Sequence, residues 1–121
     1  MSERDVQALI RLEASRKGVK LWRNNVGATR CPDGGYLRYG LANDSQQLNA
    51  VFKSSDLIGI RPITITQDMV GQVIGQFIAR EVKPTSWVYK STERERAQKA
   101  FIDLINAYGG DAAFCTQEGT L

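Results

Sequence analysis

A glutamate and a lysine lie two positions apart near the end of an apolar stretch, FIAREVKP, which covers residues 77–84. Because alternate residues of a β-strand point to the same side, Glu81 and Lys83 share one face of the predicted strand, and Val82 points the other way, toward the core. Pro84 cannot donate a hydrogen bond to a sheet, so the strand ends there and the pair can open to solvent. An edge-strand salt bridge would use the same two residues, so the pair alone does not show whether its role is structural or catalytic.

Asp56 stands at the start of an earlier apolar stretch, SDLIGI, which covers residues 55–60. If the two predicted strands are neighbours, Asp56 and Glu81 can bind one divalent cation while Lys83 holds a water molecule or balances the charge of a phosphate. Such a carboxylate pair favours Mg²⁺ or Mn²⁺. The chain has no histidine, which excludes His-ligated zinc and the Ser-His-Asp and Cys-His arrangements. These residue types therefore predict metal-dependent hydrolysis of a phosphodiester.

Length and composition describe an ordinary globular chain. It has 121 residues, enough for one compact domain, with 42% hydrophobic and 24% charged residues. Nine of the 16 lysines and arginines lie between Arg11 and Arg61, and this crowding of basic residues in the first half permits a nucleic-acid face. No apolar run approaches the roughly 20 residues of a membrane span, so we expect a soluble intracellular protein. Cys31 and Cys115 are far apart in the sequence, and we expect both to be ordinary thiols.

The hydrophobic pattern predicts helices over residues 2–17 and 92–107, the second opened by a capping box of Thr92 and Glu95. Residues 24–49 are rich in Gly, Pro, Asn and Asp and are predicted to be a long loop. The predicted strands cover residues 19–22, 56–60, 63–66, 72–83 and 112–115, with a meander through the middle three. This order predicts an α/β fold, with a small mixed sheet flanked by two helices and an acidic cluster along one edge.

Several stretches together resemble one family. SDLIGI, FIAREVK and AQKAFIDLINAYGG, with SERDVQ near the start and WRNNVGATR…YLRYGL before the acidic motif, are similar to the PD-(D/E)XK nuclease superfamily, and within it to the VRR-NUC family of virus-type replication-repair nucleases. The resemblance covers nearly the whole chain. It implies a single nuclease domain over residues 1–121 with a restriction-endonuclease-like core. It also implies a metal-dependent DNA endonuclease that uses water as the nucleophile and leaves a 5′-phosphate.

The resemblance also implies roles for individual residues. Asp56 and Glu81 would be metal ligands, and the backbone carbonyl of Val82 would be a further ligand. Lys83 would be the catalytic lysine. Gln98 matches a glutamine that such nucleases place beside the site, although a solvated helix residue would look the same in the sequence.

The first helix is expected to add another acid to the metal site, and two residues compete for this place. Glu3 stands in SERDVQ, as the early glutamate of the family does, whereas Glu13 lies on the apolar side of the predicted helix. We favour Glu3. Ser55 stands where the family signature has a proline, and residues 43–54 make the approach to Asp56 longer than expected.

The expected partner is DNA, and the candidate phosphate contacts are Arg23, Asn24, Asn25, Arg30 and Arg38, for each of which a solvated surface role fits equally well. The stand-alone virus-type members that the chain resembles imply a homodimer that acts on branched DNA, such as four-way junctions. Two other functions would fit the sequence. One is a non-catalytic DNA-binding or assembly module on the same fold, and the other is a metal-dependent phosphatase that holds small substrates in a pocket. The presence of Asp56, Glu81 and Lys83 together favours the nuclease.

Overall fold

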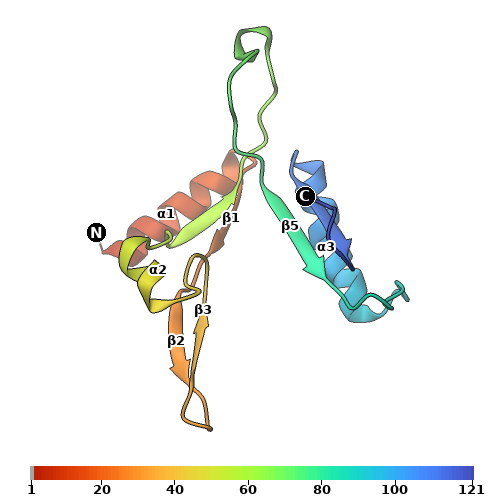
Figure 1. Ribbon diagram of the computed structural model, residues 1–121. Helices are drawn as coiled ribbons and strands as arrows, with labels where there is room; N and C mark the ends of the chain where they lie inside the picture. Colours follow the sequence, from red (N-terminus) through yellow and green to blue (C-terminus); the bar gives the residue numbers. More distant parts are fainter. Residues whose placement is uncertain (1) are drawn as a thin grey trace. The chain divides into compact units, whose positions relative to one another are not determined.

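The protein is a small mixed α/β fold of helices and short two-stranded sheets (Figure 1). The computed structural model describes residues 2–121. The chain divides into two compact units, residues 1–59 and 60–121. Among the described residues, no helix is both long and apolar enough to cross a membrane. Both cysteines are free thiols, as predicted.

The first unit begins with helix α1 (Glu3–Arg16), which packs against strand β1 (Lys20–Arg23). The Ser2 hydroxyl accepts a hydrogen bond from the Asp5 backbone, and the Asp5 carboxylate accepts one from the Ser2 backbone at 3.0 Å, which forms a capping box and starts the helix. Strand β4 (Leu57–Ile60) pairs with β1. The two backbones approach so closely at Gly59 that an added Cβ would lie 1.9 Å from the Lys20 carbonyl oxygen, so only glycine fits there.

A β-hairpin over residues 27–39 occupies half of the segment that is predicted to be a loop. Strands β2 (Gly27–Arg30) and β3 (Tyr36–Tyr39) pair antiparallel, and helix α2 (Gln46–Val51) follows after a Ser45 N-cap. The loop prediction for residues 24–49 is therefore wrong. Pro32, Asp33 and Gly34 form the turn of this hairpin, and Gly34 has a positive φ of 91° that glycine adopts without strain.

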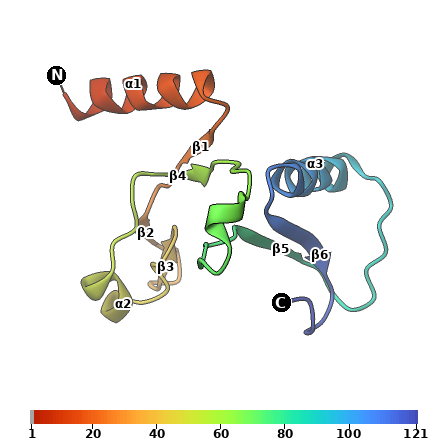
Figure 2. The same ribbon diagram turned by 90° about the horizontal axis from the view of Figure 1, so that it is seen from above.

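The second unit is a strand–helix–strand arrangement. Strand β5 (Ile78–Val82) pairs in parallel with β6 (Asp111–Cys115), and helix α3 (Glu93–Ala107) connects them and lies on one face of the pair (Figure 2). Ile102 and Ile105 of α3 are buried, together with Ala112 of β6, so the core of this unit lies between the helix and the sheet. Both predicted elements, the helix and the last strand, are confirmed.

The predicted meander is wrong. The described strands form the pairs β1–β4, β2–β3 and β5–β6, and residues 61–77 contain only a short 3₁₀ helix, η1 (Gln67–Met69). The alternating Ile63 and Ile65 imitate a strand, but this segment gains no pairing partner among the described residues. Val82 is 75% exposed, not part of the core, because α3 covers the face of β5 that carries Glu81. The single domain of residues 1–121 stays a prediction.

Candidate active site

Glu81, Lys83 and Gln98 form one hydrogen-bonded cluster in the second unit. The Gln98 Nε2 group donates to Glu81 Oε1 at 2.7 Å, and the Lys83 ammonium donates to Gln98 Oε1 at 2.8 Å. The Lys83 Nζ atom also lies 3.8 Å from Glu81 Oε1. The glutamine therefore connects the carboxylate to the ammonium group, and the three side chains hold one another in place.

The backbone explains why these three residues meet. Glu81 and Lys83 are two positions apart along an extended chain, and the Lys83 backbone N–H donates to the Cys115 carbonyl at 2.9 Å, which continues the parallel ladder by one residue beyond β5. Both side chains therefore face the same way. Gln98 lies on the part of α3 that packs over this face, so the crossover helix brings its amide to the end of the strand.

The Lys83 side chain lies beside two aromatic rings. Its Nζ atom is 5.6 Å from the ring centroid of Trp87 and 5.9 Å from that of Phe114, distances at which a cation is attracted to the π face. The two rings pack against each other with their centroids 4.7 Å apart. The Lys83 side chain is 14% exposed, compared with 39% for Glu81, so the ammonium is held inside the cluster while the carboxylate reaches solvent.

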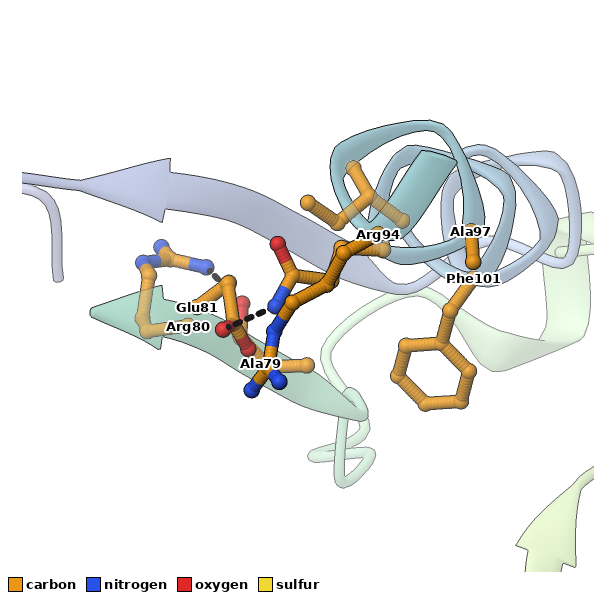
Figure 3. A pocket seen from close by; sticks show the side chains of 8 residues that line it. Ala79, Arg80, Glu81, Arg94, Ala97 and Phe101 are labelled. Atoms are coloured by element: carbon orange, nitrogen blue, oxygen red, sulfur yellow. Dashed lines mark hydrogen bonds between the residues drawn. The ribbon is translucent and has the colours of Figure 1, made fainter. Parts of the chain in front are cut away.

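A hollow of about 460 Å³ opens beside Glu81, between β5 and α3 (Figure 3). Arg94, Ala97 and Phe101 face it from the helix, and Glu81 faces it from the strand with a dashed line marking its bond to Gln98. Arg80 also lines it, but its guanidinium is paired with the Asp111 carboxylate at 3.0 Å. The hollow therefore combines a carboxylate, an arginine and an aromatic ring around open space.

The first unit holds the other predicted acids. Glu3 and Asp56 line one hollow of about 840 Å³, and Arg4 and Arg23 line it with them. Asp56 precedes β4, and its carbonyl accepts a hydrogen bond from the Asn24 backbone at 2.8 Å, which fixes the start of the strand. Glu13 does not line this hollow and is instead paired with Lys17 at 3.4 Å. Of the two candidate acids on α1, Glu3 is thus the one that lines the same hollow as Asp56.

These donors suit a hard divalent cation. Mg²⁺ is commonly bound by one or two carboxylates together with water and substrate phosphates, and Glu3 and Asp56 offer such a pair. Among residues 2–121, no group of three or more His, Cys, Asp or Glu side chains gathers as a complete metal cage.

The five candidate DNA contacts differ in their surroundings. The Asn24 amide donates to Ser54 Oγ at 2.7 Å and to the Ser55 carbonyl at 3.0 Å, so it holds the chain just before Asp56. Arg38 donates to the side chain and the backbone of the buried Asn43. Both side chains therefore stabilise the first unit.

The remaining three candidates are exposed. Arg30 lies over the Tyr36 ring, 5.3 Å from its centroid, and bonds to its hydroxyl at 2.8 Å. Arg23 and Asn25 are also exposed, and Arg23 shares the hollow of Glu3 and Asp56. Arg23 is thus the candidate that the structure places beside the predicted acids.

Sequence reasoning missed the aromatic surroundings of Lys83. Trp87 and Phe114 lie four and 31 positions from the lysine, on a connection and on β6, so no local pattern joins them. Glu95 was predicted as part of a capping box, but its hydrogen bond to Trp87 was not. A tryptophan just after the strand end was the available signal, because a buried indole N–H needs an acceptor.

No family model, no curated protein and no solved structure matches this chain. The functional interpretation therefore depends on the side chains described above and on the resemblance in the motifs.

Proposed function

We propose that the protein is a divalent-metal-dependent DNA endonuclease with a PD-(D/E)XK core of the VRR-NUC type. The observation that carries the proposal is the Gln98 amide between Glu81 and Lys83, with hydrogen bonds of 2.7 and 2.8 Å. A salt bridge at a strand end needs no third residue. A glutamine that orients both the carboxylate and the ammonium supports a role in which the positions of both groups matter.

The proposed roles follow from the hydrogen-bonding capacity of each group. Gln98 occupies Oε1 of Glu81, so we assign the second oxygen, Oε2, to the cation. The Lys83 ammonium has three N–H donors and gives one to Gln98, which leaves donors for a water molecule or a phosphate oxygen. Water attacks phosphorus in line, the bond from phosphorus to the 3′ oxygen breaks, and the products are a 5′-phosphate and a 3′-hydroxyl. The positive charge of Lys83 stabilises the negative charge that develops on the phosphate.

We assign the metal to the carboxylates of Glu3, Asp56 and Glu81 and to the Val82 carbonyl, as the family resemblance implies. A bound Mg²⁺ or Mn²⁺ would supply further positive charge for the phosphate oxygens. The carboxylates that line the hollow of Asp56 and the one beside Gln98 are all oxygen donors of the kind such ions prefer.

The substrate we propose is branched DNA, and the working unit is a homodimer. A chain of 121 residues with one such site has little surface with which to hold a duplex and choose a cleavage position. Two copies related by a two-fold axis would match the symmetry of a four-way junction and double the basic surface.

A cleavage assay tests the proposal. The protein is incubated with a four-way junction and with a linear duplex of the same sequence, with Mg²⁺, with Mn²⁺, and with a chelator. We expect cleavage that needs metal and that Glu81→Gln abolishes. Glu118→Gln removes an exposed carboxylate outside the cluster and should leave cleavage unchanged. DNA binding without cleavage under all these conditions would instead favour a non-catalytic DNA-binding module.

A further inference from the structure

One carboxylate accepts hydrogen bonds from three residues of the connection between β5 and α3. Glu95 is 7% exposed and accepts three hydrogen bonds: from Trp87 Nε1 at 2.7 Å, from the Lys90 backbone at 2.9 Å and from the Thr92 backbone at 3.1 Å. Its own backbone N–H donates to the Thr92 hydroxyl at 3.1 Å, which completes the capping box of α3. The bonds from the Thr92 backbone, and to a smaller extent those from Lys90 and Trp87, lower the pKa of Glu95 to about 2 against the opposing effect of burial.

A capping box needs only the two reciprocal bonds between Glu95 and Thr92. The extra bond to the Trp87 indole fixes the plane of a ring that lies beside Lys83. Trp87 in turn packs on Phe114 of β6, with Tyr89 at 6.2 Å from the Trp87 centroid and 5.9 Å from the Phe114 centroid. The connection thus forms one wall of the space that the lysine occupies.

We propose that Glu95 and Trp87 are positioning residues for Lys83. In this arrangement Glu95 holds the indole, and the indole together with Phe114 keeps the Lys83 ammonium against Gln98 and Glu81. The inference rests on the proposed function, because it explains how the lysine of that same site is oriented.

Flexibility of the lysine explains why such support matters. A lysine stem has four rotatable bonds and loses rotamer entropy when it is fixed, so an ammonium at a strand end would otherwise turn toward water. Lys83 lies at the end of β5, where only its backbone N–H continues the ladder. The rings restrict the stem and leave the ammonium facing the carboxylate. A displacement of about 1 Å at a reacting group can cost a hundredfold in rate, so loss of the wall would be measurable.

The first test follows Lys83 directly and needs no enzymatic activity. Aromatic rings shift the NMR signals of nearby protons, so the Lys83 Hε and Cε signals of the full-length protein report the distance to the Trp87 ring. We expect a ring-current shift in the wild type that Trp87→Leu reduces to the part contributed by Phe114 and that Glu95→Gln reduces to a smaller extent. Tyr89→Leu is the matched control, because it removes a ring from the same cluster and should leave the Lys83 signals in place.

The second test separates positioning from a general loss of stability. On junction DNA with Mn²⁺, Trp87→Leu and Glu95→Gln should lower kcat roughly ten- to a hundredfold with little change in KM, and Trp87→Phe should retain more activity than Trp87→Leu. Tyr89→Leu should stay near the wild-type kcat. Equal losses in all four variants would mean that the cluster is only structural and would overturn the inference.

The two tests also separate this inference from the proposed function. If the wild type cleaves no DNA but Trp87→Leu and Glu95→Gln still shift the Lys83 signals, the nuclease proposal fails and the positioning of Lys83 stands. If the Lys83 signals are the same in the wild type, in Trp87→Leu and in Glu95→Gln, the inference is wrong whether or not the protein is a nuclease.

Discussion

Gln98 has a side chain whose chemistry matches its two partners. A carboxylate only accepts hydrogen bonds and an ammonium only donates them, so one group that serves both must have a donor and an acceptor. The amide has both, and its orientation follows: Nε2 faces Glu81 and Oε1 faces Lys83. A glutamate at this position would repel Glu81, and a lysine would repel Lys83. The identity of residue 98 is therefore set by the pair that it connects.

Lys83→Met tests the role of the ammonium group. Methionine keeps most of the apolar stem beside Trp87 and Phe114, so the fold should be retained, but the positive charge is lost. We expect cleavage of junction DNA to fall about a hundredfold or more, with only a small change in melting temperature. Lys90→Met, an exposed lysine on the same connection, is the control and should cleave normally. Activity close to the wild type in Lys83→Met would remove the lysine from the mechanism.

The metal prediction also belongs to single residues. If Asp56 and Glu81 bind a cation, Mg²⁺ or Mn²⁺ should raise the melting temperature of the protein. The free energy of unfolding should rise by about 2.7 kcal/mol when the metal concentration is a hundredfold above its dissociation constant. Asp56→Asn, Glu81→Gln and Glu3→Gln should each reduce this gain.

Glu13→Gln is the matched control for the metal titration, because Glu13 lies on the same helix as Glu3 and is paired with Lys17. The melting temperatures of the wild type and of all four variants are measured by thermal unfolding at increasing metal concentrations. A gain that depends on Glu13 and not on Glu3 would reverse our choice of helix acid, and no gain at all would argue against a metal site.

At the scale of elements, the sequence predicts best where local chemistry decides the outcome. Helices α1 and α3 begin at capping boxes whose residues, Ser2 with Asp5 and Thr92 with Glu95, lie within one turn. The hairpin of residues 27–39 was missed because its Pro-Asp-Gly turn and glycines read as a loop when pairing is ignored. Pairing joins distant residues, and composition alone does not reveal it.

In the candidate site, too, the contacts between residues close in the sequence could be predicted and those between distant residues could not. A common face for Glu81 and Lys83 could be predicted, because residues two apart on a strand always share one. The hydrogen bond that Gln98 donates to Glu81, the one that it accepts from Lys83 and the position of the Phe114 ring could not be predicted. They depend on how α3 crosses between two parallel strands and on the register that sets Glu81 opposite Phe114.

The stability of the α3 start should depend on pH through Glu95. The pKa of this carboxyl falls from 4.5 to about 2 in the folded chain, so the folded state favours the charged form. Its contribution to stability is fully present above the ordinary pKa of 4.5 and is lost as the pH falls toward 2. We therefore expect the stability difference between the wild type and Glu95→Gln to be largest near neutral pH and to shrink in acid.

Urea unfolding of the wild type and Glu95→Gln at about pH 7 and about pH 3 measures this difference, and other titrating groups cancel in the comparison. Asp5→Asn offers a parallel case, because hydrogen bonds from Ser2 lower the pKa of Asp5 in the capping box of α1. A difference for Glu95→Gln that is equal at both pH values would show that the charge of Glu95 does not stabilise the fold.

At the scale of the whole molecule, the basic surplus is uneven. Residues 1–59 carry nine lysines and arginines against six acids, whereas residues 60–121 carry seven of each. The net charge of +3 thus belongs to the first unit, and the Glu81 cluster belongs to the second. For the proposed nuclease we therefore expect electrostatic attraction to DNA to come mainly from the first unit. Such a surplus is small for a protein that must hold a duplex, which favours two copies acting together.

The last prediction concerns that pairing. We expect light scattering at micromolar concentration to give twice the 13.5 kDa mass of one chain, and the four-way junction to be cleaved faster than the matched linear duplex. The candidate pairing surface is the end of α2, where Val51 is 77% and Phe52 62% exposed. A charge there should oppose burial, so Phe52→Glu should give a monomer that loses its preference for the junction. Val73→Glu, at an apolar residue that is 98% exposed on the 61–77 connection, should remain a dimer. A wild-type monomer that cleaves both substrates equally well would show that two-fold symmetry plays no part in choosing the substrate.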